Sequence, residues 1–174
     1  YAEPARAFIE SHGGLVRTGS TARMAFVGNR FLGVETKKEL IAARAVISAV
    51  PWFALPRLFD PTPAPLARVV GLAAEMRGMP IVTVHLWFDT PVLDEPFLGL
   101  LDRHTDWVFD TRHTFGAGAS HLTLVSSGAQ DIVRLSNEEL RERALRDLRA
   151  TVPRARDASL VHALVIRERQ ATFS

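Results

Sequence analysis

The sequence predicts an α+β fold: an antiparallel sheet with flanking helices, preceded by a smaller segment built around a β-hairpin. Apolar and polar residues alternate along 80–88, as in a strand, and the pair Gly28-Asn29 separates two apolar runs, as in a tight hairpin turn. A capped helical pattern precedes Pro153. The chain has 174 residues, of which 47% are hydrophobic and 23% charged, so it is long enough to bury a core.

The first fifty residues predict a helix followed by strands. A helix is expected over 3–12, where Phe8 and Ile9 share one side and the pair Gly13-Gly14 ends it. The hairpin strands are expected at 24–27 and 31–34, and a second turn follows at 37–39.

Residues 45–50 form a short apolar run that ends at Pro51 and shows little alternation, which is typical of a strand buried on both faces. Five prolines then fall within 51–65, a density typical of a linker. We therefore predict one domain segment over 1–51 (helix, hairpin and re-entrant strand) and a second domain over 52–174.

The second domain begins with an expected helix over 66–76 and continues as sheet plus helix. Ser136 and Glu139 form a capping box, and Leu140, Ala144 and Leu148 share one helix face. The expected strands cover 80–88, 105–111, 120–127 and 158–168.

Composition excludes several functions. The net charge is +2, and no basic run is interleaved with aromatics, so we expect no nucleic-acid partner. The absence of cysteine removes thiol catalysis and disulfides. No histidine or carboxylate spacing matches a metal-binding motif, so we expect no metal site.

Two strands carry candidate ligand-binding residues. Period-two geometry places Ile81, Thr83, His85 and Trp87 on one strand face of mixed polarity, as in many cavity walls. The alternative is that His85 is simply a hydrogen-bonded residue on a half-exposed strand. The next strand puts two more aromatics on one side, and they are either core residues or part of a binding surface. These aromatics are Trp107 and Phe109.

The order of segments resembles the middle of flavin-dependent amine oxidases and of carotenoid or phytoene desaturases. In those enzymes a helix ends in paired glycines, a hairpin follows, and a strand similar to Ala43-Arg44-Ala45-Val46-Ile47-Ser48-Ala49-Val50-Pro51 re-enters the FAD-binding domain. Three more stretches resemble the squalene-associated FAD-dependent branch, the hydroxysqualene dehydroxylases. They are 82–89, 107–110 and 165–173.

The chain departs from this family pattern in three ways. The N-terminal G-x-G-x-x-G turn, which holds the FAD pyrophosphate, is not in this sequence, and neither is the C-terminal Gly-Asp segment. Arg44 stands where the family commonly has Asp. Because the sequence opens at Tyr1 without Met and stops straight after a strand-like run, we expect an internal fragment of a longer protein.

The resemblance implies a role for each candidate. Ala22 matches the position whose backbone meets the FAD adenine, and Ala49, Val50 and Pro51 lie where the chain passes the cofactor. The fragment alone is not expected to retain FAD. The resemblance also implies a substrate domain whose sheet covers the flavin, with a wall made of Ile81, Thr83, His85, Trp87, Trp107 and Phe109.

The implied reaction is hydride transfer through flavin N5 on an isoprenoid lipid of the squalene type, within hopanoid or squalene biosynthesis. His85 would be the catalytic proton donor to a departing hydroxyl. Two alternatives stay open: a flavin amine oxidase fragment, and a non-catalytic lobe that binds a lipid or a partner. The amine oxidase reading requires a lysine beside the flavin, and Lys37 and Lys38 fall in a predicted turn.

An insoluble substrate must be collected from a bilayer, so we expect a cytoplasmic protein with peripheral contact at the inner face of the membrane. The contact would use the apolar residues of the proline-rich segment. The alternative is that this linker packs against its own domain. The residues concerned are Trp52, Phe53, Leu55, Leu58 and Phe59.

Overall fold

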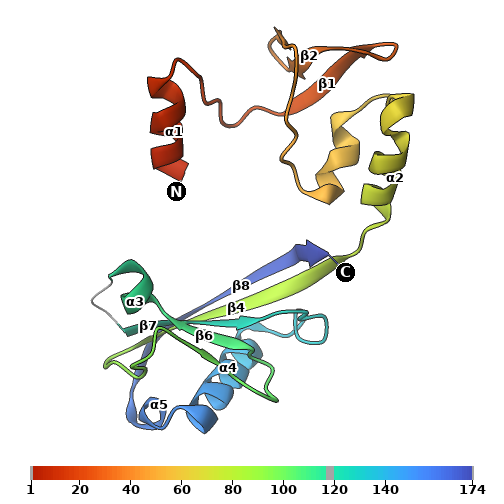
Figure 1. The fold of residues 1–174 in the computed structure, drawn as a ribbon. Helices are drawn as coiled ribbons and strands as arrows, with labels where there is room; N and C mark the ends of the chain where they lie inside the picture. Colours follow the sequence, from red (N-terminus) through yellow and green to blue (C-terminus); the bar gives the residue numbers. More distant parts are fainter. Residues whose placement is uncertain (1, 117–119, 174) are drawn as a thin grey trace. The chain divides into compact units, whose positions relative to one another are not determined.

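The computed structural model describes residues 2–116 and 120–173. They form two compact units, residues 1–76 and 77–174, drawn in Figure 1. The division falls after Met76, whereas the sequence places a domain boundary at residue 51. Residues 52–76 belong to the first unit because the helical turns within them contact one another and β1.

The first unit contains a helix and a small sheet. Helix α1 (Ala2–Ser11) precedes the sheet, which has the order β1-β2-β3. Its antiparallel strands are β1 (Ala22–Val27), β2 (Arg30–Thr36) and β3 (Leu40–Ala42). The predicted helix, the hairpin and the turn at 37–39 are confirmed, whereas the short strand β3 was not predicted.

The strand predicted at 45–50 is wrong: these residues have no regular secondary structure. A strand buried on both faces needs paired neighbours and covering layers, and no described strand of this chain pairs with the segment. Ile47, at its centre, is 93% exposed. The segment is apolar, as the sequence shows, but the described residues do not bury it.

The proline-rich segment folds into short helical turns. Helix η1 (Trp52–Leu58) and η2 (Ala64–Leu66) are 3₁₀ helices, and α2 (Ala67–Glu75) follows. Leu55 and Phe59 line an apolar cavity of about 250 Å³ together with Met24 and Phe26 of β1. The segment is therefore anchored to the hairpin sheet by apolar packing.

The second unit is a five-stranded antiparallel sheet with the order β5-β6-β7-β4-β8. Figure 1 shows α4 and α5 together on one side of this sheet. The strands are β4 (Gly78–Phe88), β5 (Phe97–Gly99), β6 (Trp107–Asp110), β7 (Ser120–Ser126) and β8 (Leu160–Phe173). The helices are α3 (Thr111–Phe115), α4 (Asn137–Thr151) and α5 (Arg154–Asp157).

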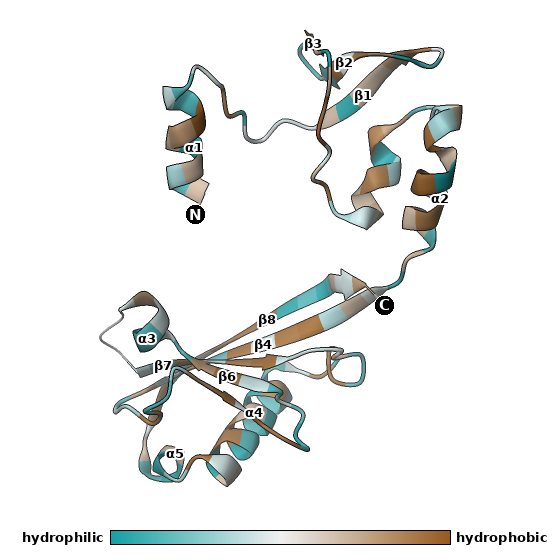
Figure 2. Ribbon diagram, viewed as in Figure 1, coloured by the Kyte–Doolittle hydropathy of each residue, from teal (hydrophilic) through white to brown (hydrophobic). Residues whose placement is uncertain are grey.

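Alternation along each strand separates a core face from an open face. Along β4, Val82, Val84, Leu86 and Phe88 are buried, while the residues between them are only partly buried. Helix α4 packs against β4 and β8, and brings Leu140, Ala144 and Leu148 into the core, as predicted. Figure 2 shows the hydrophobic and hydrophilic bands that alternate along these strands.

Local signals explain the boundaries of α4. The Ser136 hydroxyl accepts a hydrogen bond from the backbone N–H of Glu139, and the Glu139 carboxylate accepts one from the backbone N–H of Ser136. The Ser136 hydroxyl also donates to the Glu139 carboxylate, and the two hydrogen bonds that this carboxylate accepts lower its pKa. The helix thus begins where the capping box predicts and ends two residues before Pro153.

Candidate functional site

The open face of the five-stranded sheet brings the predicted wall residues together. Thr83, His85 and Trp87 of β4 lie opposite Val125, Thr123 and His121 of β7, respectively. Strand β6 continues the surface, because Trp107 pairs with Val125 and Phe109 with Thr123. Directly paired residues of antiparallel strands share a face. Six predicted residues therefore lie on one face: Ile81, Thr83, His85, Trp87, Trp107 and Phe109.

Strands β5 and β8 extend this face at its two edges. Phe97 of β5 pairs with Phe109, and Leu164 and Ile166 of β8 pair with His85 and Thr83. The side chains of Phe97, Leu164 and Ile166 are exposed. An apolar patch of this extent on a sheet typically marks a binding surface rather than a solvated face.

A pair of histidines occupies the middle of the open face. The Nδ1 atom of His85 lies 3.1 Å from Nε2 of His121 and 3.1 Å from Oγ1 of Thr123. The ring of His121 stacks on Trp87, with centroids 4.0 Å apart and planes inclined by 10°. The indole thus fixes the orientation of the His121 ring, and His121 and Thr123 fix that of His85.

Burial lowers the pKa of His85. Burial also lowers the pKa of His121, the neighbouring His85 lowers it further, and the Asp110 carboxylate opposes these two effects. Both histidines are consequently held toward the neutral form near pH 7. The sequence indicated His85 but not His121, because which strand lies beside β4, and in which register, is set by the fold.

Strand β6 and helix α3 are joined by a buried ion pair. The Asp110 carboxylate, fully buried, accepts hydrogen bonds from Nε and Nη2 of Arg112 and from its backbone N–H at 2.6–3.1 Å. Arg112 also donates to the carbonyl oxygen of Leu93 at 2.6 Å. Burial raises the pKa of Asp110, but the hydrogen bonds and charge of Arg112 outweigh it and lower the pKa overall.

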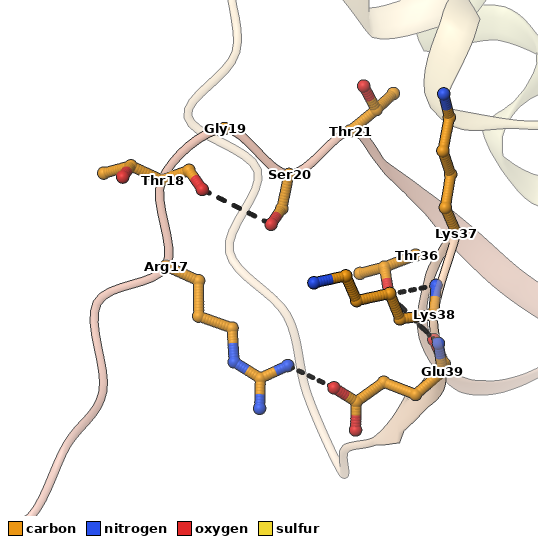
Figure 3. A pocket seen from close by; sticks show the side chains of 9 residues that line it. All are labelled: Arg17, Thr18, Gly19, Ser20, Thr21, Thr36, Lys37, Lys38 and Glu39. Carbon is orange, nitrogen blue, oxygen red and sulfur yellow. Dashed lines mark hydrogen bonds and ion pairs between the residues drawn. The ribbon is translucent and has the colours of Figure 1, made fainter.

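The first unit has a polar cavity of about 460 Å³ beside the predicted adenine contact. Figure 3 shows Lys37 and Lys38 on this cavity, and Arg17 paired with Glu39 at 2.5 Å. Ala22 follows Thr21, which lines the cavity, and begins β1.

The residues proposed to contact FAD fit only its periphery. Ala22 lies in an edge strand, whose outer row of backbone groups is open to a ligand. Ala49, Val50 and Pro51 are exposed and have no regular secondary structure. Among the described residues, no glycine-rich turn leads from a strand into a helix to form a pyrophosphate cradle. These four residues could contact FAD at its edge but would not enclose it.

Comparison with known proteins places this fold in context. The sequence model described as "Flavin containing amine oxidoreductase" matches residues 1–166. None of the curated proteins compared with the chain matches it by sequence.

Three solved structures share the fold. A candidate protoporphyrinogen oxidase from Exiguobacterium sp. 255-15 is 13% identical, with a TM-score of 0.64, over 92% of this chain and 36% of its own. An oxidoreductase from Methanosarcina mazei is 16% identical, with a TM-score of 0.69, over 94% of this chain and 40% of its own. A reduced UDP-galactopyranose mutase is 13% identical, with a TM-score of 0.59, over 83% of this chain and 34% of its own. This chain therefore spans well under half the length of these proteins.

Proposed function

Because the chain belongs to the family of flavin containing amine oxidoreductases, we propose that it is the substrate-binding part of an FAD-dependent oxidoreductase. The observation that carries the proposal is the open face of the five-stranded sheet. Its centre consists of aromatic, aliphatic and uncharged polar side chains, and Glu168, which pairs with Ile81, lies toward one end. Such a wall suits an extended apolar substrate better than a charged one.

We propose an isoprenoid lipid of the squalene type as the substrate, and dehydroxylation of hydroxysqualene as the reaction. Bound FAD, once reduced by an external reductant, would supply the hydride. The protein would orient the hydrocarbon along Trp87, Trp107 and Phe109, exclude water, and present His85 to the departing hydroxyl. A flavin amine oxidase is less well supported, because that reaction requires a lysine beside the flavin and the two lysines of this sequence, Lys37 and Lys38, lie in the turn between β2 and β3.

The decisive experiment uses the full-length protein. We expect the visible spectrum of the purified protein to show flavin bands that survive gel filtration, and anaerobic incubation with a reductant and hydroxysqualene to yield squalene. A flavoprotein that leaves hydroxysqualene unchanged would contradict the substrate but not the family. A folded protein that stays colourless after FAD is added would contradict the oxidoreductase proposal, and would favour the non-catalytic lobe that binds a lipid or a partner.

Peripheral membrane contact stays a prediction. Among the described residues, no helix is long and apolar enough to cross a bilayer. Trp52 and Phe53 are half-buried in η1 with their rings edge to face, and Leu55 and Phe59 pack on the first unit. We expect Trp52→Ser/Phe53→Ser to reduce cosedimentation of the full-length protein with liposomes several-fold. Unchanged cosedimentation would reject the membrane role of this segment.

A further inference from the structure

We propose that His121 is a positioning residue that holds His85 with its proton on Nδ1, so that Nε2 of His85 is the atom that gives a proton to the ligand. The inference rests on the proposed function for its ligand, but on the histidine pair alone for its geometry. His85 and His121 lie on neighbouring strands, and the direct partner of His85 in the ladder is Thr123. An imidazole nitrogen and a hydroxyl oxygen therefore converge on one nitrogen of His85, and in the tautomer that we propose both accept from its Nδ1–H.

The second nitrogen of His85, Nε2, differs from Nδ1 in its surroundings. Among the described residues, no group makes a hydrogen bond to Nε2 of His85, whereas Nδ1 has two. A histidine whose one nitrogen donates to a fixed acceptor reacts through the other nitrogen, because the hydrogen bond selects the tautomer. The stacked indole of Trp87 limits rotation of the His121 ring and thereby keeps the acceptor in place.

The pair can carry one extra proton but not readily two. In the singly protonated pair, His85 has protons on both nitrogens, and its Nδ1–H donates to the lone pair on Nε2 of His121. A second proton would have to occupy that lone pair, which would break the hydrogen bond and put two cations in contact. Other titratable groups on adjoining elements are Asp110, Arg112 and His113 of β6 and α3, and His162 and Glu168 of β8.

Proton donation then follows a balanced course. The carbon–oxygen bond of the substrate breaks with both electrons going to oxygen, and the oxygen takes the Nε2 proton of His85 and leaves as water. His85 becomes neutral and keeps its Nδ1–H bond to His121. The reductant would be the reduced flavin of the proposed function, which would supply hydride to the carbon.

The test is a histidine-ring nitrogen NMR titration of the 174-residue chain without flavin or substrate. We expect neutral His85 to be mainly the Nδ1–H tautomer. We also expect the pair to titrate in two steps separated by at least about one pH unit. In His85→Phe, His121 should titrate in one step, at higher pH than the second step of the pair, because no charge on His85 then lowers its pKa.

The variant His121→Phe keeps a planar ring against Trp87 but removes the acceptor nitrogen. We expect this variant to lose most of the Nδ1–H preference of His85, and His121→Asn repeats the test if the larger ring disturbs the sheet. His104→Asn, which changes an exposed loop residue, is the control and should leave both signals unchanged.

The proposal is overturned if neutral His85 is mainly the Nε2–H tautomer in the unsubstituted chain. It is also overturned if each ring titrates in a single step whose pH does not change when the other histidine is replaced. Neither result would depend on the flavin or lipid experiments. Failure of the pair and failure of the proposed function are therefore distinguishable.

Discussion

Replacing Arg112 with Met is expected to destabilise the second unit by about 3–5 kcal/mol at pH 7. The substitution keeps an unbranched apolar stem but removes the cation from a carboxylate that is fully buried. Asp110 would then retain only the backbone N–H of residue 112 as a donor, and the carbonyl of Leu93 would also lose its partner. Removal of one member of a buried pair costs far more than the pair contributes, because the other charge stays desolvated.

The loss of unfolding free energy in Arg112→Met should depend on pH in a definite direction. In the unsubstituted chain the folded-state pKa of Asp110 is lowered, so its contribution to stability is full above the unfolded-state pKa. That contribution is lost as the pH falls through the folded-state pKa. In Arg112→Met, Asp110 loses the side-chain hydrogen bonds and the charge of Arg112, and we expect burial to outweigh the remaining backbone hydrogen bond and His113 and to raise its pKa. The carboxyl then protonates on folding, and the difference between the two proteins shrinks in acid.

Arg154→Met is the matched control. Arg154 pairs with Asp94 at the same N···O distance of 2.6 Å, but both side chains are more than 60% exposed. Exposed pairs contribute about 0–1 kcal/mol. Urea unfolding followed by tryptophan fluorescence in a Trp52→Phe background reports on Trp87 and Trp107 of the second unit. Equal losses in the two variants would show that burial of Asp110 does not govern the energy.

The features that were predictable from the sequence are those with local causes. The capping box at Ser136 and the stop before Pro153 lie within a few residues of the helix they bound, and α4 matches them. The alternation in β4 needs no information about neighbouring strands, and it correctly divides 80–88 into a buried and an open face. Strand β5, with three residues, offers too short a pattern to detect.

The features that escaped prediction depend on partners distant in the sequence. An apolar run such as 45–50 predicts burial, but a strand forms only where another strand supplies its hydrogen bonds. Likewise, the sequence does not predict that His121 contacts His85, since 36 positions separate the two residues. The two histidines come into contact only because the antiparallel register of β4 and β7 places Thr123 opposite His85 and His121 opposite Trp87.

In the reaction that we propose for the full-length protein, His85→Gln is expected to lower the rate of squalene formation from hydroxysqualene by about 10²–10⁴-fold, the usual contribution of a positioned proton donor. Glutamine retains a polar side chain of similar length but cannot donate a proton as an acid. Binding of the hydrocarbon should change much less, because the aromatic wall at Trp87, Trp107 and Phe109 is untouched. We therefore expect the loss to appear in kcat rather than in KM.

The pH profile separates proton donation by the pair from simple packing. A donor must be protonated, and burial lowers the pKa of both His85 and His121. The rate should therefore rise as the pH falls below the usual histidine range near 6.5, until the first proton saturates the pair. His121→Phe should reduce kcat less than His85→Gln does, and should alter this profile, because the proton on His85 loses its fixed acceptor. A rate that is independent of pH, or a His85→Gln enzyme as fast as the His104→Asn control, would exclude His85 as the proton donor and leave the open face as a binding wall alone.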